Sequence, residues 1–475
     1  MIAVSDPLPP LTARLAPDAD LAGSTSRAGA VIAAMLGFLS FMPYPALPIG
    51  RQSALEMGSV LALVLLVPAL ALSWRKRPIS LYLLIVAPLV LSAVKVAVTD
   101  AGDLDLCVKS IGVWAIACLT MVVVQWCAPR YALQLLTGIA VATLVHVGVG
   151  ACQLYSFSNG EFPFADLYVN QSFMSVQANA DLIANYIQRP FGIFPEPSAM
   201  ACSLAPWILF WIAEICGVVR LRHEPARWQR ILFASAAIGG LALIILSRSG
   251  HTMITLTAAF FLGALWFRKL KATPRTFSIG LLVFGVILPL TLWATFQTMG
   301  GRVDELEVAN GSWAERSESL MVGFNLFARG DFSTIFFGMG SGLAAPTLLH
   351  TSGLDAVASV LLTYIYETGL VGTIVVCWIG AVLWRAWRTS QFNAAFAAIA
   401  VVWLAGITLT TCYNQLLPIW FALGWLTVWP QISALAPEPV ASAAASRIER
   451  RGFWTGPPVH AWTQGRKMSR PHPTS

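Results

Sequence analysis

Residues 75–98 read RKRPISLYLLIVAPLVLSAVKVAV, and this stretch decides the fold class. Three basic residues at 75–77 precede the apolar run 79–98, in which Lys95 is the one charged residue. A helix needs about twenty apolar residues to cross the hydrocarbon core of a bilayer, and basic residues gather in the loops on the cytoplasmic side. The stretch therefore predicts a membrane-spanning helix that starts at the inner face.

The chain as a whole has the composition of a membrane protein. Of its 475 residues, 57% are hydrophobic and 11% are charged, whereas soluble proteins carry roughly 25% charged residues. This composition excludes a soluble enzyme with a lipid anchor and predicts an all-α polytopic membrane protein. Reading for further apolar runs, we expect about twelve transmembrane helices, near residues 29–49, 56–74, 79–98, 107–126, 131–155, 198–219, 231–247, 251–267, 277–298, 357–384, 395–412 and 415–431.

Two polar tails flank the predicted membrane domain, which covers residues 29–431. Residues 1–28 are rich in Pro and lack the basic start of a secretory signal, so we expect an N-terminal cytoplasmic tail. Residues 432–475 are rich in Ala, Pro, Ser and Arg, and we expect a disordered, basic cytoplasmic tail there.

The distribution of Lys and Arg predicts which loops face the cytoplasm. Most of the 30 basic residues fall in the two tails and in alternate loops, which places both chain ends inside. The opposite, outer side then holds six basic residues: Arg51, Arg189, Arg248, Arg302, Arg316 and Arg329. The net charge of +7 therefore reflects topology. The basic residues form no single stripe, so we expect no nucleic-acid partner.

Two long loops, 156–197 and 299–356, both fall on the predicted outer side. Most connections between helices are short, and long ones tend to carry function. The second loop contains four large apolar residues at helical spacing: Trp313, Leu320, Phe324 and Phe327. They predict a helix that lies flat against the outer leaflet, with Arg316 on the same face. A shorter equivalent is predicted over 178–188.

The cysteines and histidines do not form the patterns that bind metals. All eight cysteines lie in or beside apolar runs and no two are spaced as C-x-x-C, so we interpret them as small buried hydrophobic residues. The six histidines are scattered, without H-E-x-x-H or any paired spacing. We therefore expect no bound metal and no cofactor.

Several short motifs resemble one known family. Residues 189–199, RPFGIFPEPSA, look like the R-x-x-G-x-F-x-E-P-S signature of bacterial exopolysaccharide and O-antigen polymerases, in the O-antigen ligase/polymerase superfamily. Residues 246–250, LSRSG, are similar to that family's S-R-[SG] turn between two spans. Residues 338–342, GMGSG, and 366–372, YETGLVG, look like its closing G-x-G and E-x-G-L-x-G pattern.

The resemblance implies a GT-C-like glycosyltransferase that uses undecaprenyl-diphosphate-linked oligosaccharides as its substrate. Such an enzyme would polymerise these repeat units into exopolysaccharide or O-antigen at the outer, periplasmic face of the bacterial inner membrane. The partners implied are the lipid-linked substrate, the lipid bilayer, and a chain-length regulator and a flippase of the same pathway.

The candidate site residues suit this chemistry. A lipid-diphosphate leaving group carries dense negative charge, which Arg binds bidentately while staying protonated. We therefore predict that four outer arginines bind the diphosphate: Arg189, Arg248, Arg316 and Arg329. A general base must take the proton of the acceptor sugar hydroxyl, and the candidates are Glu196 and His350.

Each of these residues also has a structural interpretation. Arg316 and Arg329 could pair with lipid phosphates instead of substrate. Glu196 precedes Pro197 at the start of a span, where a carboxylate favours the helix dipole and could serve only as a cap. His350 could be an ordinary loop histidine.

Three further ionisable residues, Lys95, Glu214 and Glu367, lie inside predicted spans. Ionisable residues are costly there and often functional. A structural polar contact between helices is the alternative, and both interpretations stay open at this point.

The nearest alternative function is that of an O-antigen ligase, which transfers finished polymer to the lipid A core. In the ligases a His-Asn pair stands about nine residues before the glutamate of E-x-G-L-x-G. Here Ala358 occupies that place before Glu367, and His350 precedes Thr351, which favours the polymerase. A transporter or flippase for the lipid-linked sugar is a third possibility, but the sequence shows no repeated halves of the kind many transporters have.

Overall fold

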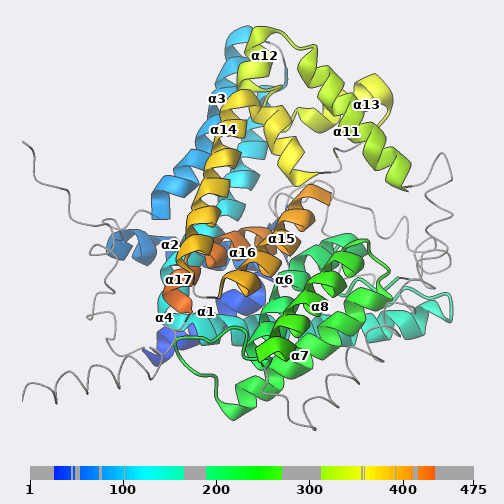
Figure 1. Ribbon diagram of the computed structural model, residues 1–475. Helices are drawn as coiled ribbons and strands as arrows, with labels where there is room; N and C mark the ends of the chain where they lie inside the picture. Colours follow the sequence, from blue (N-terminus) through cyan, green and yellow to red (C-terminus); the bar gives the residue numbers. More distant parts are fainter. Residues whose placement is uncertain are drawn as a thin grey trace, which may run out of the picture. The chain divides into compact units, whose positions relative to one another are not determined.

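A computed structural model describes residues 26–43, 46–48, 54–73, 78–100, 102–164, 189–269, 312–354, 357, 359–390, 392–409 and 416–433. The predicted span 277–298, the predicted helix 178–188 and most of both predicted tails lie outside these ranges. Within them the chain is almost entirely helical (Figure 1).

The helices are α1 (Arg27–Leu39), α2 (Met57–Ser73), α3 (Pro78–Thr99), α4 (Leu104–Phe157), α6 (Pro197–Ile215), α7 (Arg227–Leu246), α8 (His251–Lys269), α11 (Ser312–Ala328), α12 (Phe332–Phe337), α13 (Ala344–Ser352), α14 (Val360–Thr389), α15 (Asn393–Leu409), α16 (Leu417–Thr427) and α17 (Trp429–Ile432). Among the described residues, five helices are long and apolar enough to cross a membrane, namely α3, α4, α6, α7 and α14. These helices confirm the prediction of a helical membrane protein. Twelve spans and a GT-C fold stay predictions.

The first predicted span, 29–49, was wrong beyond Leu39, where α1 ends. Two short antiparallel strands follow, β1 (Ala46–Pro48) and β2 (Ala54–Glu56). The sequence between Leu39 and β2 contains three prolines, each of which removes a backbone donor and clashes with the preceding helical turn. A helix of the length of α1 covers about 20 Å at 1.5 Å per residue, less than the roughly 30 Å of a bilayer core.

α4 combines two predicted spans, 107–126 and 131–155, in one helix that bends at its middle. Tyr131, two residues after Pro129, has non-helical backbone angles (φ −126°, ψ 29°). Proline cannot donate to the helical ladder and forces the preceding turn apart, which explains the bend. α4 packs on α1, α2, α3, α7 and α16, so it joins helices from the beginning, the middle and the end of the described chain.

Glycines allow α1 and α4 to approach backbone to backbone. A Cβ atom added to Gly138 would lie 2.0 Å from the carbonyl oxygen of Ala34, and one added to Gly37 would lie 2.2 Å from that of Leu135. Small residues at such contacts are typical of helix packing in membranes, where close backbone approach replaces the hydrophobic effect.

The predicted outer loop 299–356 contains three helices, α11, α12 and α13, where one was expected. α11 confirms the predicted helix, but its apolar residues do not share one environment. Phe327 lies 6.0 Å from the ring of Tyr366 in α14, and the Tyr366 hydroxyl donates to the carbonyl of Leu320, whereas Phe324 is 62% exposed. One side of α11 therefore packs on protein. The side chains of Trp313 and Arg316 lie outside the described residues.

The described residues extend to Ser433, two residues into the predicted C-terminal tail. Leu221 forms an antiparallel bridge with Ser433, and the Arg222 amide donates to the carbonyl of Ile432 at 2.9 Å. The tail was predicted from composition, which does not register backbone pairing with a distant segment.

Candidate functional site

Three predicted site residues, Arg189, Glu196 and Arg248, lie at one end of the helices α4, α6 and α7. Glu196 immediately precedes α6, and Arg248 follows α7, which returns antiparallel to α6 after a short connection (Figure 1). Near the C-terminal end of α4, a Cβ atom added to Gly150 would lie 2.4 Å from the Leu243 side chain and 3.6 Å from that of Pro190. The Arg189 loop and the end of α7 therefore meet at the same turn of α4.

The loop between Arg189 and Glu196 is bound to α4 by one glutamine. Gln153 Oε1 accepts hydrogen bonds from the backbone N–H groups of Phe191 and Gly192, both at 3.0 Å, and its Nε2 donates to the Gly192 carbonyl at 2.8 Å. Gln153 is fully buried. A single side chain thus pairs three backbone groups that would otherwise be buried without partners.

A histidine two turns earlier on α4 holds the other half of the same loop. His146 Nδ1 accepts from the Ile193 N–H at 3.1 Å, which leaves Nε2 as the donor to the Phe41 carbonyl at 2.7 Å. The His146 ring also stacks on Phe194, with centroids 4.6 Å apart. The loop passes so close that a Cβ atom on Gly192, whose φ is +58°, would lie 2.7 Å from His146 Nδ1.

His146 and Gln153 were not predicted as site residues. They lie seven residues apart, hence on one face of α4, inside an otherwise apolar run. Polar side chains so placed in a membrane helix are unusual, and their shared face was the signal that could have identified them. They position the loop, while Arg189 and Glu196 stand at its two ends.

Glu196 occupies the N-cap position of α6 without capping it through its side chain. Its backbone is extended (φ −156°, ψ 162°), Pro197 is the first helical residue, and the carboxylate does not cap the backbone N–H groups of the first turn. The Ser198 hydroxyl donates to Glu196 Oε1 instead. The side chain is half-buried. The carboxylate therefore lies at the positive end of the α6 dipole, in a place where it can also take a proton.

Arg248 stands in a tight turn between α7 and α8. Ser247 and Thr252, both buried, each donate through the hydroxyl to the Ile244 carbonyl, at 2.7 and 2.8 Å. Between them Arg248 is exposed and has φ +51°, a conformation that costs a non-glycine residue about 1–2 kcal/mol. Its buried neighbours hold this conformation, which directs the guanidinium away from the helices.

The other three predicted site residues belong to a second group of helices. Arg316 is on α11, Arg329 follows α11 and is exposed, and His350 is exposed in the last turn of α13. α11, α12 and α13 pack on one another and on α14, and α12 also packs on α3. Of the two predicted bases, Glu196 thus lies in the same group of helix ends as Arg189 and Arg248, whereas His350 lies in the second group.

The two halves of the predicted closing motif, 338–342 and 366–372, lie against each other. α14 breaks at Gly369 (φ 67°, ψ −149°), and there the Met339 N–H donates to the Tyr366 carbonyl at 2.8 Å. The buried Glu367 carboxylate faces the backbone N–H groups of Gly342 and Ala344, and its Oε2 has no hydrogen-bond partner among the described residues. Glu367 therefore serves as a polar contact between α14 and the glycine loop.

Lys95 makes a second polar contact in this region. Its Nζ donates to the Thr334 hydroxyl at 3.1 Å and to the Gly338 carbonyl at 3.3 Å, joining α3 to both ends of α12. At the start of α12, hydrogen bonds from Thr334 and Ser333 lower the pKa of Asp331 to about 2. The structural interpretation of Lys95 and Glu367 is thus the one that these contacts favour.

Within the described ranges, no group of three or more His, Cys, Asp or Glu side chains is placed to hold a metal ion. Cys107, Cys118, Cys127 and Cys202 are buried, as predicted, and Cys216 is half-buried. Cys152 and Cys377 are exposed, so that prediction was wrong for them. They lie on outward faces of α4 and α14, where the surroundings of an apolar residue are lipid, which a sequence pattern cannot distinguish from protein.

No protein-family model, curated protein or solved structure matches this chain.

Proposed function

We propose that the protein is a polymerase of lipid-linked oligosaccharides. It transfers a growing glycan from undecaprenyl diphosphate to the next lipid-linked repeat unit, at the outer face of the bacterial inner membrane. The observation that carries the proposal is the loop 189–196, which buried polar residues bind to α4 with an arginine at one end and a carboxylate at the other.

The reaction needs a cationic site for the leaving group and a base for the acceptor. Arg189 and Arg248, at one end of α4, α6 and α7, bind the lipid diphosphate through their planar guanidinium groups. The acceptor hydroxyl attacks the anomeric carbon of the donor sugar, and Glu196 takes the hydroxyl proton. The bond from that carbon to the diphosphate oxygen breaks, and the diphosphate leaves with its lipid.

Arg316 and Arg329 supply further positive charge from the α11 side, where the diphosphate or the incoming repeat unit approaches. His350 is the second candidate for the base. This arrangement requires the topology that the basic residues indicate, with both chain ends in the cytoplasm and the loops 156–197 and 299–356 outside. A flippase delivers the substrate and a chain-length regulator limits the product.

The experiment that tests the function is the analysis of lipid-linked saccharides in a strain that lacks this protein. A polymerase leaves single repeat units on the lipid. Long polymer still attached to lipid would identify a ligase instead, and accumulation confined to the cytoplasmic leaflet would identify a flippase. Re-expression of the wild-type chain must restore the polymer.

A further inference from the structure

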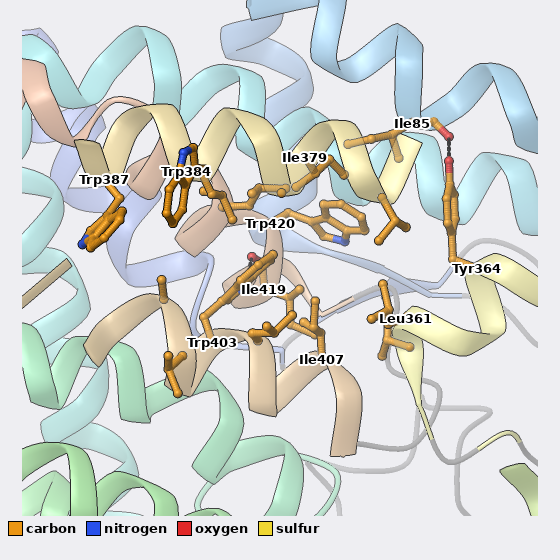
Figure 2. Close-up of a pocket in the computed structure, with 18 of the residues that line it drawn as sticks. Ile85, Leu361, Tyr364, Ile379, Trp384, Trp387, Trp403, Ile407, Ile419 and Trp420 are labelled. Carbon is orange, nitrogen blue, oxygen red and sulfur yellow. Dashed lines mark hydrogen bonds between the residues drawn. The ribbon is translucent and has the colours of Figure 1, made fainter. Parts of the chain in front are cut away.

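An apolar cavity of about 510 Å³ lies among α14, α15 and α16. Its size falls in the range of small-molecule sites, roughly 300–1,000 Å³. Figure 2 shows Trp384, Trp403 and Trp420 around the space between α14 and α15. Trp403 and Trp420 are nearly buried and form its floor, whereas Trp384, Val401 and Leu404 are about half exposed and form an open rim. The cavity is therefore a groove on the side of the helices.

Three polar side-chain atoms around the groove are paired with backbone carbonyls. The Tyr364 hydroxyl donates to the Ile85 carbonyl at 2.8 Å, as Figure 2 shows, and Trp403 Nε1 donates to the Ile419 carbonyl at 3.0 Å. Trp387 Nε1 donates to the Asn393 carbonyl at 3.0 Å, which joins α14 to α15 at one end of the groove. The groove thus offers apolar contact to its occupant.

The length of the groove matches one leaflet. Along α15 it runs from Phe396 to Ile407, or about 16 Å at 1.5 Å per residue. Half of a bilayer core is about 15 Å. One hydrocarbon chain of a lipid, which reaches from the interface to the midplane, therefore fills the groove from end to end.

One arginine, Arg388, stands at the end of the groove where Trp384 and Trp387 lie. It is exposed, and within the described part of the chain its guanidinium forms no ion pair, whereas Arg385 lies on the opposite side of α14 from the residues that line the groove. Arg388 follows Trp384 by four residues, so it lies one turn further on the same side of α14. Tryptophan and arginine together are typical of the membrane interface, and the charge distribution predicts that this is the inner one.

We propose that this groove binds an anionic phospholipid of the inner leaflet. One acyl chain lies between α14 and α15, and Arg388 binds the headgroup phosphate. Basic residues between membrane helices on the cytoplasmic side bind anionic headgroups in this way. The site is distinct from the proposed polymerase site and does not depend on it.

Native mass spectrometry of the full chain, released from detergent with added lipid, tests the proposal. Phosphatidylglycerol and phosphatidylcholine with identical sixteen-carbon chains are the two probes. We expect one phosphatidylglycerol to be retained per chain, in preference to phosphatidylcholine. Loss of the charge in Arg388→Gln should weaken phosphatidylglycerol binding about fivefold. The control, Arg385→Gln, removes the same charge from the opposite side of α14 and should bind as wild type.

A second variant fills the groove. Gly380 lines it, and a Cβ atom added there meets no atom within 4 Å, so Gly380→Phe extends into the groove without a clash. Binding should be lost in Gly380→Phe and kept in Gly148→Phe, whose site on α4 is equally open. The readout is lipid retention, so it stands whether or not the protein polymerises glycans.

Four results would overturn the proposal: equal retention of the two lipids, unchanged binding in Gly380→Phe, displacement of phosphatidylglycerol by an equimolar polyprenyl phosphate, or no retained lipid in the wild type. The third would assign the groove to the isoprenoid chain of a substrate. The fourth would mean that no lipid occupies it.

Discussion

At the residue scale, buried polar side chains fix the backbone of the candidate site. Gln153 and His146 hold the backbone of 191–193, and the resulting loop ends in Arg189 and Glu196. Ser247 and Thr252 hold Arg248 in a left-handed turn in the same manner. Buried polar networks are rigid when every member is paired, so they fix the geometry of groups that are themselves partly exposed.

Replacing Gln153 by Leu should abolish polymer formation although the residue is remote from the sugar. The change leaves buried N–H and C=O groups of Phe191 and Gly192 without partners, at a cost of about 1–3 kcal/mol for each. We expect a lower unfolding temperature in detergent and unpolymerised repeat units in cells. Gln125→Leu is the control, since Gln125 lies on the same helix and donates to the side chain of Thr427 at 2.8 Å, away from the loop 189–196. Normal polymer in Gln153→Leu would show that the reaction does not depend on the geometry of the loop 189–196.

Replacing Glu196 by Gln separates catalysis from support of the helix. Loss of a favourable interaction with the helix dipole costs about 1 kcal/mol or less, whereas loss of a general base slows the reaction by roughly a hundredfold to ten-thousandfold. We expect normal protein levels and single repeat units in Glu196→Gln. Glu214→Gln, at the other end of α6, should leave the polymer unchanged. If Glu196→Gln makes full-length polymer while His350→Ala does not, His350 is the base.

Replacing Arg248 by Gly should give a more stable protein than replacing it by Ala, and both variants should be inactive. Glycine adopts φ near +51° freely, so Arg248→Gly should be about 1 kcal/mol more stable than Arg248→Ala. Both variants lack the guanidinium, and both should fail to polymerise. Thermal unfolding and glycan analysis of the two variants together check this. An active Arg248→Gly variant would show that Arg248 only supports the turn between α7 and α8 and does not bind the substrate.

At the element scale, Gly369 interrupts α14 and frees backbone groups that an unbroken helix would pair internally. The predicted span 357–384 corresponds to a helix that is broken at Gly369, and the freed backbone groups bond the 338–342 loop. A membrane helix tolerates such a break only where protein replaces the lost hydrogen bonds. The carbonyl groups that the break in α14 frees therefore need the N–H groups of the 338–342 loop, and those N–H groups need the freed carbonyls.

Replacing Gly369 by Ala should disrupt this junction. A Cβ atom there would lie 2.5 Å from the Gly338 nitrogen and 2.7 Å from the carbonyl oxygens of Ile335 and Phe336, at a φ of +67°. We expect destabilisation of at least about 2 kcal/mol, the upper end of the backbone cost alone. Gly380→Ala, in open space on the same helix, should be neutral or up to about 1 kcal/mol more stable. Unfolding by heat in detergent measures both, and equal stability of the two variants would contradict the broken helix.

At the scale of the whole molecule, the proposed site draws on two groups of helices. Arg189, Glu196 and Arg248 belong to the ends of α4, α6 and α7, while Arg316, Arg329 and His350 belong to the α11–α13 region. A common substrate requires both groups to face the same side of the membrane. Topology is therefore the premise on which the proposed mechanism rests.

Fusion of a phosphatase that is active only outside the cytoplasm tests this premise. A fusion after Gly330 should be active and one after Arg388 inactive, because basic residues of short loops stay in the cytoplasm. Enzyme activity in whole cells, normalised to fusion-protein level, is the measurement. The reverse pattern would place the arginines of the proposed site inside and exclude an outer-face reaction.

The sequence by itself determined the class of protein and the position of most helices. The starts of α3, α6 and α8 fall within one residue of the predicted spans. The physical reason is that a backbone in lipid must satisfy its hydrogen bonds internally, so a long apolar run has few structures other than a helix. The candidate residues Arg189, Glu196 and Arg248 were likewise selected from the sequence, because they stand in the short motifs 189–199 and 246–250 and carry charge on the predicted outer side.

Only the tertiary structure decided which residues act together. Gln153 bonds a carbonyl 39 residues away, and Lys95 bonds a hydroxyl 239 residues away. The break at Gly369, the left-handed turn at Arg248 and the exposed faces of α11 likewise depend on neighbours that are distant in sequence. An apolar run specifies a helix through local hydrogen bonds, but it does not specify which face meets lipid and which meets protein. That choice is made by packing between helices.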